Sequence, residues 1–308
     1  MNVLLAVDES CDVKAAAQFL SRIQFPADSD LYLLHVNSLD EWLRSDTSGR
    51  SLHMVEHINR SRAAAADRMR HLLSQMENTF YTPSLTVHSI VTEGVPGAEI
   101  LRIIPEYHID LVVLGTRRRS PISSFLLGSV SEWVLNEAPC SVLIVRGKTR
   151  PRKSTKGLNI LMATDGSPDA KDAVEFAGRV GLPPSTVLTL LHVVRKRVHQ
   201  TAQLVTTDGI QPATFKKLAE DLLKARGRDG ATLLEATRKA LNCPGLKIVE
   251  NLAFGHEAGE ILKAAKRTRA DLVVMGSRGL TGLRRFLLGS VSNKVTRHAT
   301  CSVLVVRK

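Results

Sequence analysis

Residues 271–292 read DLVVMGSRGLTGLRRFLLGSVS, and this stretch decides the fold. A run of valine and leucine without a polar break is typical of a strand buried on both faces of a parallel sheet. Glycines and serines follow the run, ahead of a helical pattern. In open α/β sheets the ligand lies at the carboxyl ends of the strands, where helix N-termini also point, so the stretch predicts a binding loop as well as a strand.

The stretch has a second copy earlier in the chain. DLVVLGTR at 110–117 corresponds to DLVVMGSR at 271–278, 161 residues later, and FLLGSVS begins at both Phe125 and Phe286. Nearer the start of each copy the offset is 157, so the second copy holds a net four extra residues between its second strand and Gly255. A repeat of this length indicates an internal duplication of one whole domain.

Each copy alternates short apolar runs with longer stretches of helical periodicity. In the second copy the predicted strands cover 158–164, 186–194, 247–254, 271–276 and 301–306. The predicted helices cover 169–180, a long part of 214–241, 258–268 and 289–298. Five strands and four crossovers predict two tandem doubly wound five-stranded parallel-sheet α/β domains of Rossmann-like type. The polar segment TRPRKSTKG at 149–157 predicts a linker, which divides the chain into domains 1–150 and 151–308.

The composition is that of an ordinary globular protein, with 44% hydrophobic and 23% charged residues. No apolar run approaches the roughly 18–20 residues that span a bilayer, and the start MNVLLAVDES meets acidic residues too early for a secretory signal. The cysteines at 11, 140, 243 and 301 lack metal-type spacing, and we expect them to be buried apolar residues in a reducing compartment. We therefore expect a cytoplasmic protein.

The net charge of +12 is unevenly distributed. Residues 1–150 hold 15 Lys and Arg against 17 Asp and Glu, whereas residues 151–308 hold 27 against 13, a net +14. A basic half attracts polyanions, which include nucleic acid and small phosphate-bearing ligands. Only 4% of the residues are aromatic, and they do not alternate with the basic ones as a platform for stacking bases requires. The pattern therefore argues against nucleic acid as a partner.

The residues after the fourth strand of the second copy have the chemistry of a phosphate site. Gly276, Gly279 and Gly289 allow positive φ angles and a close approach of the backbone to oxygen atoms. Gly289 and Ser290 open the last helix, whose free N–H groups and dipole stabilise a phosphate. Ser292 adds a second hydroxyl. A structural interpretation, a turn followed by a helix cap, also explains the glycines.

Basic side chains accompany this loop. We expect Arg278, Arg284 and Arg285 to bring positive charge near a bound anion. The loop lacks the Gly-Lys-Ser/Thr of a Walker A motif, and it follows the fourth strand, whereas the dinucleotide fingerprint follows the first. The sequence therefore excludes these two phosphate-binding motifs.

The repeat, the strand context and the loop together resemble the universal stress protein family, in particular its tandem two-domain members. The resemblance covers nearly all of the 308 residues. The family's ATP-binding signature, G-x2-G-x9-G-S/T, is complete at Gly276, Gly279, Gly289 and Ser290. The resemblance implies ATP, accompanied by Mg²⁺, as the ligand of the second domain.

The resemblance also implies roles for individual residues. Asp165, at the end of the first strand, corresponds to the acidic residue that meets the adenosine moiety. Val193 stands where the main chain contacts adenine, while its neighbour His192 is expected to face the interior or a helix. The implied cofactor-binding site consists of Ala163, Thr164, Asp165, Val193, Met275, Gly276, Arg278, Gly279, Gly289, Ser290, Val291 and Ser292.

The first copy departs from the signature, because Arg118 stands where the second glycine belongs. We expect a left-handed backbone conformation at that position, where a side chain costs about 1 kcal/mol or more and occupies space near the phosphates. The other signature positions are retained. The weaker candidate site of the first domain consists of Asp8, Val36, Gly115, Gly128 and Ser129.

No catalytic residue and no metal site is predicted. His53, Glu56 and His57 fit the H-x-x-E-H pattern of some zinc hydrolases, but no third ligand is evident, and a solvated helix face is the simpler interpretation. Glu99 and Glu260 recur at matching places and suit the first turn of a helix. Nothing resembles a nucleophile with a supporting base, so we do not expect an enzyme, and any ATP hydrolysis should be slow.

The sequence thus predicts a tandem universal stress protein that binds ATP, or another adenine nucleotide, in its second domain and acts as a nucleotide-dependent stress-response regulator. The β-branched final strands at 140–146 and 301–307 are expected to pair the two domains, and a homodimer of the whole chain is left open. Two alternatives remain. One is an interaction protein with vestigial sites, and the other is an adenylyl-transfer enzyme, whose His-x-Gly-His signature is absent. No membrane partner is expected.

Overall fold

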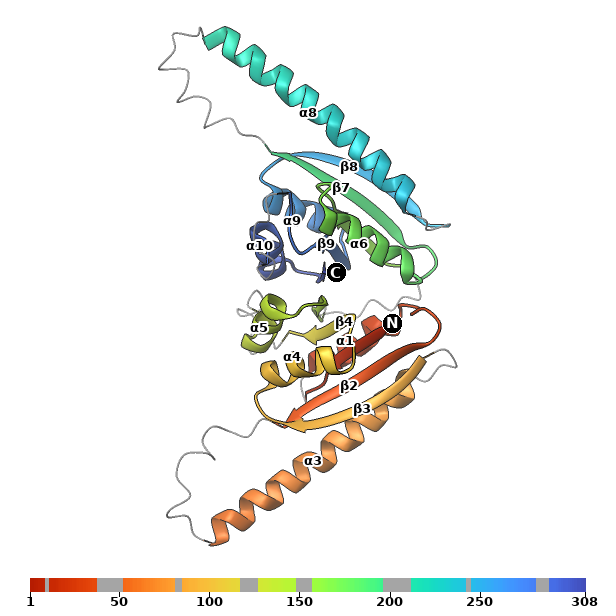
Figure 1. Ribbon diagram of the computed structural model, residues 1–308, viewed down its shortest axis with the longest axis vertical. Helices are drawn as coiled ribbons and strands as arrows, with labels where there is room; N and C mark the ends of the chain where they lie inside the picture. Colours follow the sequence, from red (N-terminus) through yellow and green to blue (C-terminus); the bar gives the residue numbers. More distant parts are fainter. Residues whose placement is uncertain are drawn as a thin grey trace. The chain divides into compact units, whose positions relative to one another are not determined.

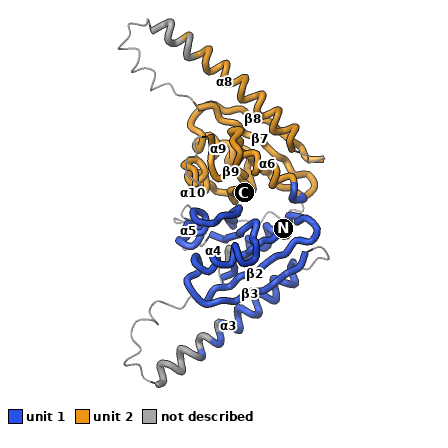
Figure 2. The backbone as a smooth tube through the Cα atoms, in the orientation of Figure 1, with its two compact units in different colours: residues 1–151, 179–181 blue, residues 152–178, 182–308 orange. Residues whose placement is uncertain are grey.

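The computed structural model describes most of the chain, drawn as coloured ribbon in Figure 1. The described residues are 1–8, 11–37, 52–80, 85–116, 127–147, 157–195, 212–241, 245–280 and 288–308. The backbone forms two compact units (Figure 2). Unit 1 consists of Met1–Pro151 with Arg179–Gly181, and unit 2 consists of Arg152–Gly178 with Leu182–Lys308.

Unit 1 contains a five-stranded parallel sheet in the order β3-β2-β1-β4-β5. Its strands are β1 (Asn2–Ala6), β2 (Ser29–Asn37), β3 (Leu85–Glu93), β4 (Leu111–Gly115) and β5 (Ser141–Val145). Its described helices are α1 (Cys11–Leu20), α3 (Leu52–Phe80), α4 (Pro96–Glu106) and α5 (Ser129–Glu137). The chain returns from β3 to β4 on the far side of β1, so the direction of winding reverses there, as in a doubly wound domain.

Unit 2 repeats this arrangement, with a parallel sheet in the order β10-β9-β6-β7-β8. Its strands are β6 (Asn159–Ala163), β7 (Val187–Arg195), β8 (Lys247–Gly255), β9 (Leu272–Gly276) and β10 (Ser302–Val306). Its described helices are α6 (Pro168–Arg179), α8 (Pro212–Ala240), α9 (Glu257–Arg267) and α10 (Ser290–His298). The winding reverses between β6 and β9, and open α/β sheets bind their ligands at the carboxyl ends of the strands at this point.

The strands form because their residues are almost uniformly apolar. β9, with the sequence LVVMG, is buried at all five positions, and Ile160, Leu161 and Met162 are buried in β6. Helices cover both faces of the sheet: α9 and α10 pack against each other on one face, and α6 and α8 lie on the other (Figure 1). Burial on both faces explains why the strand sequences show no polar alternation.

The long helices α3 and α8 are copies of each other. Each has 29 residues. Their buried positions recur at an offset of 161, since Met69 and Leu73 of α3 correspond to Gly230 and Leu234 of α8. The offset is still 157 in β7, so the four extra residues of the second copy lie between β7 and α8.

The structure confirms the predicted fold class. The strands predicted at 186–194 and 247–254 correspond to β7 and β8, and the four helices predicted for the second copy correspond to α6, α8, α9 and α10. Cys140 and Cys301 are buried, as expected, while the side chains of Cys11 and Cys243 lie outside the described part. In the portion of the chain that the structure describes, no helix combines the length and the apolar character needed to cross a membrane.

Candidate functional site

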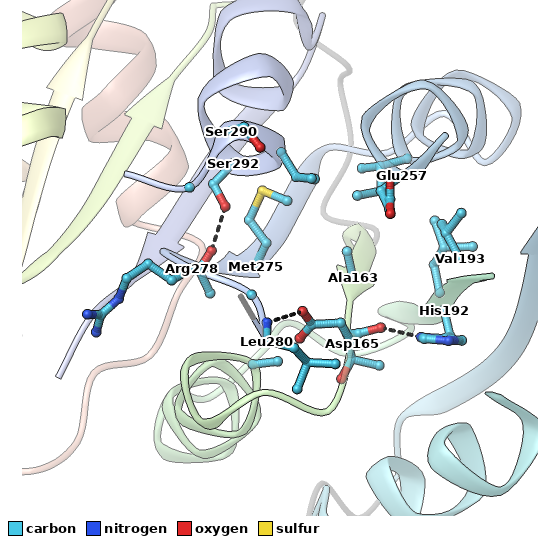
Figure 3. Close-up of a pocket in the computed structure, with 18 of the residues that line it drawn as sticks. Ala163, Asp165, His192, Val193, Glu257, Met275, Arg278, Leu280, Ser290 and Ser292 are labelled. Carbon is cyan, nitrogen blue, oxygen red and sulfur yellow. Dashed lines mark hydrogen bonds between the residues drawn. The ribbon is translucent and has the colours of Figure 1, made fainter. Parts of the chain in front are cut away.

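A cavity of about 800 Å³ lies at the carboxyl ends of β6, β7 and β9 in unit 2 (Figure 3). All twelve residues predicted for the second-domain site line it. Nine further residues complete its wall: Ala170, Leu191, His192, Arg195, Arg226, Glu257, Ile261, Leu280 and Leu288. Residues spread along the sequence from Ala163 to Ser292 are thus gathered around one space.

One end of the cavity is formed by the N-terminus of α10. Gly289 precedes this helix, and its N–H donates to the carbonyl oxygen of Ser277 at 2.8 Å. The N–H groups of Ser290, Val291 and Ser292 belong to the first turn, where no carbonyl of the helix is available to them. No side chain caps this helix among the described residues. Three backbone donors and the positive end of the helix dipole therefore make this end suitable for an anion.

The two hydroxyl groups at this end have different positions. Ser292 is buried, and its Oγ donates to the carbonyl oxygen of Gly276 at 2.8 Å, which ties α10 to the end of β9 (Figure 3). Ser290 is exposed at the first position of the helix and lines the cavity. The hydroxyl of Ser290 is therefore the one placed to donate to a ligand.

Gly276 and Gly289 lie in close contact with backbone atoms of other segments of the protein. A Cβ atom at Gly276 would lie 2.6 Å from the backbone carbonyl carbon of Asp169, at the start of α6. A Cβ atom at Gly289 would lie 3.0 Å from the carbonyl oxygen of Ser277. The helix cap of the structural interpretation is found at Gly289, which is the N-cap residue of α10. The close approach of backbone segments at both glycines is a further structural reason for them.

Gly279 lies against a carboxylate. A Cβ atom there would lie 2.6 Å from Oδ2 of Asp165, closer than a carbon and an oxygen normally approach. The left-handed backbone expected at this signature position is not found at Gly279, because the described glycines with positive φ are Gly94, Gly166 and Gly245. For Arg118, which lies outside the described residues, it stays a prediction. The space taken by Asp165, and not backbone strain, explains the glycine at position 279.

Asp165 joins the end of β6 to the loop after β9. Its Oδ1 accepts a hydrogen bond from the N–H of Ser167 (3.0 Å). Its Oδ2 accepts one from the N–H of Leu280 (3.2 Å) (Figure 3). Two carboxylate oxygens offer about four lone-pair sites, so two remain after these bonds. Asp165 is therefore able to organise the loop and to accept a hydrogen bond from a ligand as well.

The guanidinium group of Arg278 is paired with Asp169. Its Nε lies 3.0 Å from Oδ2 of Asp169, and its Nη2 lies 3.3 Å from Oδ1. The exposed fractions of the two side chains are 29% and 15%, so the pair is partly shielded from water. In Figure 3 the side chain of Arg278 extends away from Asp165. Arg278 lines the cavity without bringing the free positive charge that we expected, and Arg284 and Arg285 lie outside the described residues.

His192 links β6 to α8. Its Nδ1 is hydrogen-bonded to the carbonyl oxygen of Thr164 at 2.8 Å. On the other side of the ring, a Cβ atom at Gly230 of α8 would lie 2.8 Å from Cδ2 of His192. The expectation that His192 faces a helix is confirmed.

Three charged residues that sequence reasoning missed lie on the cavity wall. Arg195 ends β7, and its Nε lies 3.3 Å from Oε1 of Glu257, the first residue of α9. Arg226 lines the cavity from α8. A signal existed for Arg195, which lies two residues after Val193 and so on the same side of the strand. No local pattern marks Arg226, because its place depends on how α8 packs on the sheet.

Comparison with known proteins assigns the chain to a family. The sequence profile described as the universal stress protein family matches twice, over residues 1–146 and 158–307. The chain belongs to the universal stress protein family. It is a tandem member with two such domains, which confirms the resemblance found in the sequence.

Individual universal stress proteins support the same assignment. The chain is 33% identical over 148 residues to universal stress protein YxiE of Bacillus subtilis (strain 168), a match that covers 48% of this chain and 97% of the relative. It is 31% identical over 184 residues to universal stress protein MJ0531 of Methanocaldococcus jannaschii, covering 60% of this chain and 95% of the relative.

A solved structure of a universal stress protein shares the fold, and others match one half of the chain. One from Archaeoglobus fulgidus DSM 4304 matches over 100% of this chain and 96% of its own, with a TM-score of 0.60 and 21% identity. Another, solved in complex with cAMP, covers 49% of this chain and 97% of its own, with a TM-score of 0.34 and 23% identity.

The first universal stress protein domain keeps the framework of the second. Its five weaker candidates occupy matching places: Asp8 after β1, Val36 in β2, Gly115 at the end of β4, and Gly128 and Ser129 at the start of α5. Ser131 Oγ donates to the carbonyl oxygen of Gly115 at 3.4 Å, as Ser292 Oγ does to that of Gly276. Arg118 lies outside the described residues. The effect of this departure from the signature stays a prediction.

Glu99 lies in the first turn of α4, as predicted. Its Oε2 accepts hydrogen bonds from Nη2 of Arg102 and from Oγ1 of Thr92, each 2.9 Å long. The bonds from Arg102 first, and then from Thr92, lower the pKa of the Glu99 carboxyl below its ordinary value of 4.5. Glu260 holds the matching place in α9, where its Oε1 accepts a hydrogen bond from Nζ of Lys263 at 2.8 Å.

The zinc-hydrolase pattern stays untested. The side chains of His53, Glu56 and His57 lie outside the described part of the structure, although they belong to helix α3. The side chains that are described form no group of three His, Cys, Asp or Glu residues arranged as metal ligands.

Proposed function

We propose that this universal stress protein binds ATP, or another adenine nucleotide, in its second domain and acts as a nucleotide-dependent regulator in the stress response. The observation that carries the proposal is the convergence of all twelve signature-related residues on one cavity of about 800 Å³. Small-molecule and cofactor sites have volumes of about 300–1,000 Å³, so the cavity suits a ligand of this size.

The two ends of the cavity match the two ends of a nucleotide. The phosphates would lie at the N-terminus of α10. There the hydroxyl of Ser290 and the N–H groups of Ser290, Val291 and Ser292 favour negative charge. The adenosine would lie at the other end, beside Asp165 and Val193, where the carboxylate accepts a hydrogen bond from an amino or hydroxyl group. Apolar wall residues, Ile261 among them, would bury the base, and Met275 and Gly276 would lie where the ribose and phosphates begin.

Mg²⁺ would accompany the phosphates. The ion prefers oxygen ligands and keeps several of its water molecules in nucleotide sites. Asp165 and Asp169 already accept hydrogen bonds from the loop after β9. Phosphate oxygens and water would hold the ion, and the Ser290 hydroxyl and the Asp165 carboxylate are the protein oxygens on the cavity wall that could assist. The proposal assigns no catalytic role to any residue.

Isothermal calorimetry with ATP on the full chain tests the proposal. The wild-type protein should bind one ATP per chain. Gly279→Arg should weaken binding by about 10- to 100-fold, because its Cβ and guanidinium would displace Asp165 and enter the cavity. Equal binding by the two proteins would overturn the assignment, and two ATP per chain would overturn the asymmetry between the domains.

Gly178→Arg is the matched control for this substitution. Gly178 is exposed on α6, and no described atom lies within 4 Å of a Cβ placed there. The added side chain has the same size and charge but lies in solvent. ATP binding by this variant should equal that of the wild type.

A second candidate function is that of an interaction protein whose nucleotide site is vestigial. The contacts of the glycines favour it, because Gly276, Gly279 and Gly289 each lie close to other atoms of unit 2 and so have a structural role whether or not a ligand binds. Native mass spectrometry of the protein as purified distinguishes the two functions. A co-purifying adenine nucleotide would exclude the vestigial site.

A further inference from the structure

The loop after β9 is held by a residue that the ATP signature does not contain. Asp169 lies in the first turn of α6. Its Oδ2 accepts hydrogen bonds from Oγ of Ser277 (2.6 Å), from the backbone N–H of Arg278 (3.0 Å) and from Nε of Arg278 (3.0 Å). Hydrogen bonds to a charged acceptor are short and about twice as strong as neutral ones. Asp169 therefore fixes both the backbone and the side chains of two consecutive loop residues.

The position of Asp169 is itself well defined. Ser167 caps α6, since its Oγ accepts a hydrogen bond from the N–H of Ala170 at 3.2 Å and its carbonyl oxygen accepts one from Lys171 at 3.1 Å. The backbone of Asp169 also packs directly on Gly276, where a Cβ atom would lie 2.6 Å away. The carboxylate is thus attached to a rigid helix start, which makes it a fixed point for the loop.

The contact continues from the loop to the anion-binding end of the cavity. Ser277, which donates its hydroxyl to Asp169, accepts the N–H of Gly289 on its carbonyl oxygen at 2.8 Å. Gly289 precedes the three free N–H groups of α10. A chain of hydrogen bonds therefore runs from Asp169 through Ser277 to the helix start that would meet the phosphates.

We propose that Asp169 is a positioning residue for nucleotide binding, which sets the loop at Ser277 and Arg278 and, through it, the N-terminus of α10. This inference rests on the proposed nucleotide site. It also assigns a role to the Arg278 pair: because Asp169 holds the guanidinium, the phosphates are met by backbone N–H groups and not by this arginine. Losing the carboxylate would therefore affect ligands with phosphates more than ligands without them.

The test uses Asp169→Asn in the full chain, which keeps the shape of the side chain and removes its charge. Asp172→Asn is the matched control, because Asp172 lies on the same helix and its Oδ1 lies 3.6 Å from Nζ of Lys308, away from the loop. The first readout is amide hydrogen exchange at residues 277–280 without ligand. Exchange there should become about tenfold faster in Asp169→Asn and stay unchanged in Asp172→Asn. Unchanged exchange in Asp169→Asn would overturn the proposal.

The second readout is affinity for ATP and for adenosine, measured by calorimetry. Asp169→Asn should lower the affinity for ATP about tenfold and leave that for adenosine within about twofold. An equal loss for both ligands would overturn the positioning role, because it would indicate general damage to the domain. If the wild type binds neither ligand, the proposed function fails and the nucleotide-positioning role fails with it, while the exchange data still decide whether Asp169 holds the loop.

A second variant tests the same proposal in case Asp169→Asn does not fold. Ser277→Ala removes only the 2.6 Å bond to Asp169 and keeps the carboxylate and its pair with Arg278. It should accelerate exchange at residues 277–280 and weaken ATP binding in the same direction but by a smaller factor. Wild-type exchange and wild-type ATP affinity in this variant would contradict the proposal.

Discussion

The carboxylate of Asp165 determines which side chain fits at position 279. Its Oδ2 lies where it accepts the N–H of Leu280, and the same atom lies 2.6 Å from the point that a Cβ at Gly279 would occupy. The two residues come from segments far apart in the sequence. The glycine is therefore a consequence of a tertiary contact, and the two positions should be energetically coupled.

A double-mutant cycle tests this coupling. Gly279→Ala should lower the free energy of unfolding by about 1 to 3 kcal/mol, because the methyl group overlaps Oδ2 of Asp165. In a chain that also carries Asp165→Ala the same change should cost no more than about 0.5 kcal/mol. Urea unfolding of the nucleotide-free protein measures both values. Additive losses would show that Asp165 is not the obstacle.

The sequence predicted twelve of the residues that line the cavity. The spacing of the glycines and the start of the last helix indicated the loop after β9, whereas Asp165, Val193 and Met275 came from the resemblance to the universal stress proteins. Asp169 could not be predicted, since its role depends on the approach of the start of α6 to the end of β9. Arg226 escaped for a related reason, as only the packing of α8 brings it to the cavity.

At the scale of elements, the approach of α8 to the sheet depends on a glycine in the middle of the helix. A Cβ at Gly230 would lie 2.8 Å from both Cδ2 of His192 and Cδ1 of Leu252. The His192 ring is held by its hydrogen bond to Thr164, so it yields less easily than the leucine. Glycine inside a helix is unfavourable by about 1 kcal/mol relative to alanine, which indicates that packing outweighs propensity here.

Two Gly→Ala substitutions separate these effects. Gly230→Ala should lower the free energy of unfolding by about 1 kcal/mol, because the clash exceeds the gain in helix propensity. Gly178→Ala, on the open face of α6, should raise it by about 0.5 to 1 kcal/mol. Urea unfolding measures both changes. Equal stabilisation by the two alanines would contradict the close packing of α8.

The hydrogen bonds to Glu99 at the start of α4 predict that the stability of the protein decreases in acid. The hydrogen bonds to Glu99 lower its folded-state pKa below 4.5, so its contribution to stability is present above pH 4.5 and is lost as the pH falls through the lowered value. Glu99→Gln should therefore unfold at a lower temperature than the wild type at neutral pH, and the difference should shrink as the solution is acidified below pH 4.5. Thermal unfolding followed by circular dichroism across this range measures it.

Glu106→Gln is the control for that substitution. Glu106 contacts the same arginine, with Nη1 of Arg102 lying 2.6 Å from its Oε2, but its side chain is 47% exposed, and exposed ion pairs contribute little. Its unfolding temperature should stay close to that of the wild type throughout. A difference for Glu99→Gln that is constant with pH would contradict the linkage.

Most elements could be predicted because the strands are buried on both faces and the helices show a clear period. The four extra residues of the second copy could be assigned only to a wide region from sequence, because the long helices share few identical residues. The buried positions of the two helices show how they correspond, since Met69 and Leu73 of α3 match Gly230 and Leu234 of α8.

At the scale of the whole molecule, we expect the two domains to pair through their final strands, β5 and β10. Each strand ends its own sheet and is rich in valine, and unpaired strand edges tend to find a partner. Small-angle scattering of the full chain should give a compact particle with a radius of gyration of about 19 Å. A larger radius with the profile of two flexibly linked lobes would contradict the pairing.

Two arginines on the cavity wall are paired with carboxylates, so the net charge of the domain and the charge inside the cavity have different effects. The second half of the chain carries a net +14, and the long-range field of that charge concentrates polyanions of any kind. On the cavity wall, however, Arg278 is matched by Asp169 and Arg195 by Glu257, so these cations add little field inside. If the cavity binds an anion as proposed, discrimination among anions would depend less on these two arginines than on shape and on fixed backbone dipoles, which dissolved salt screens far less than it screens the surface charge.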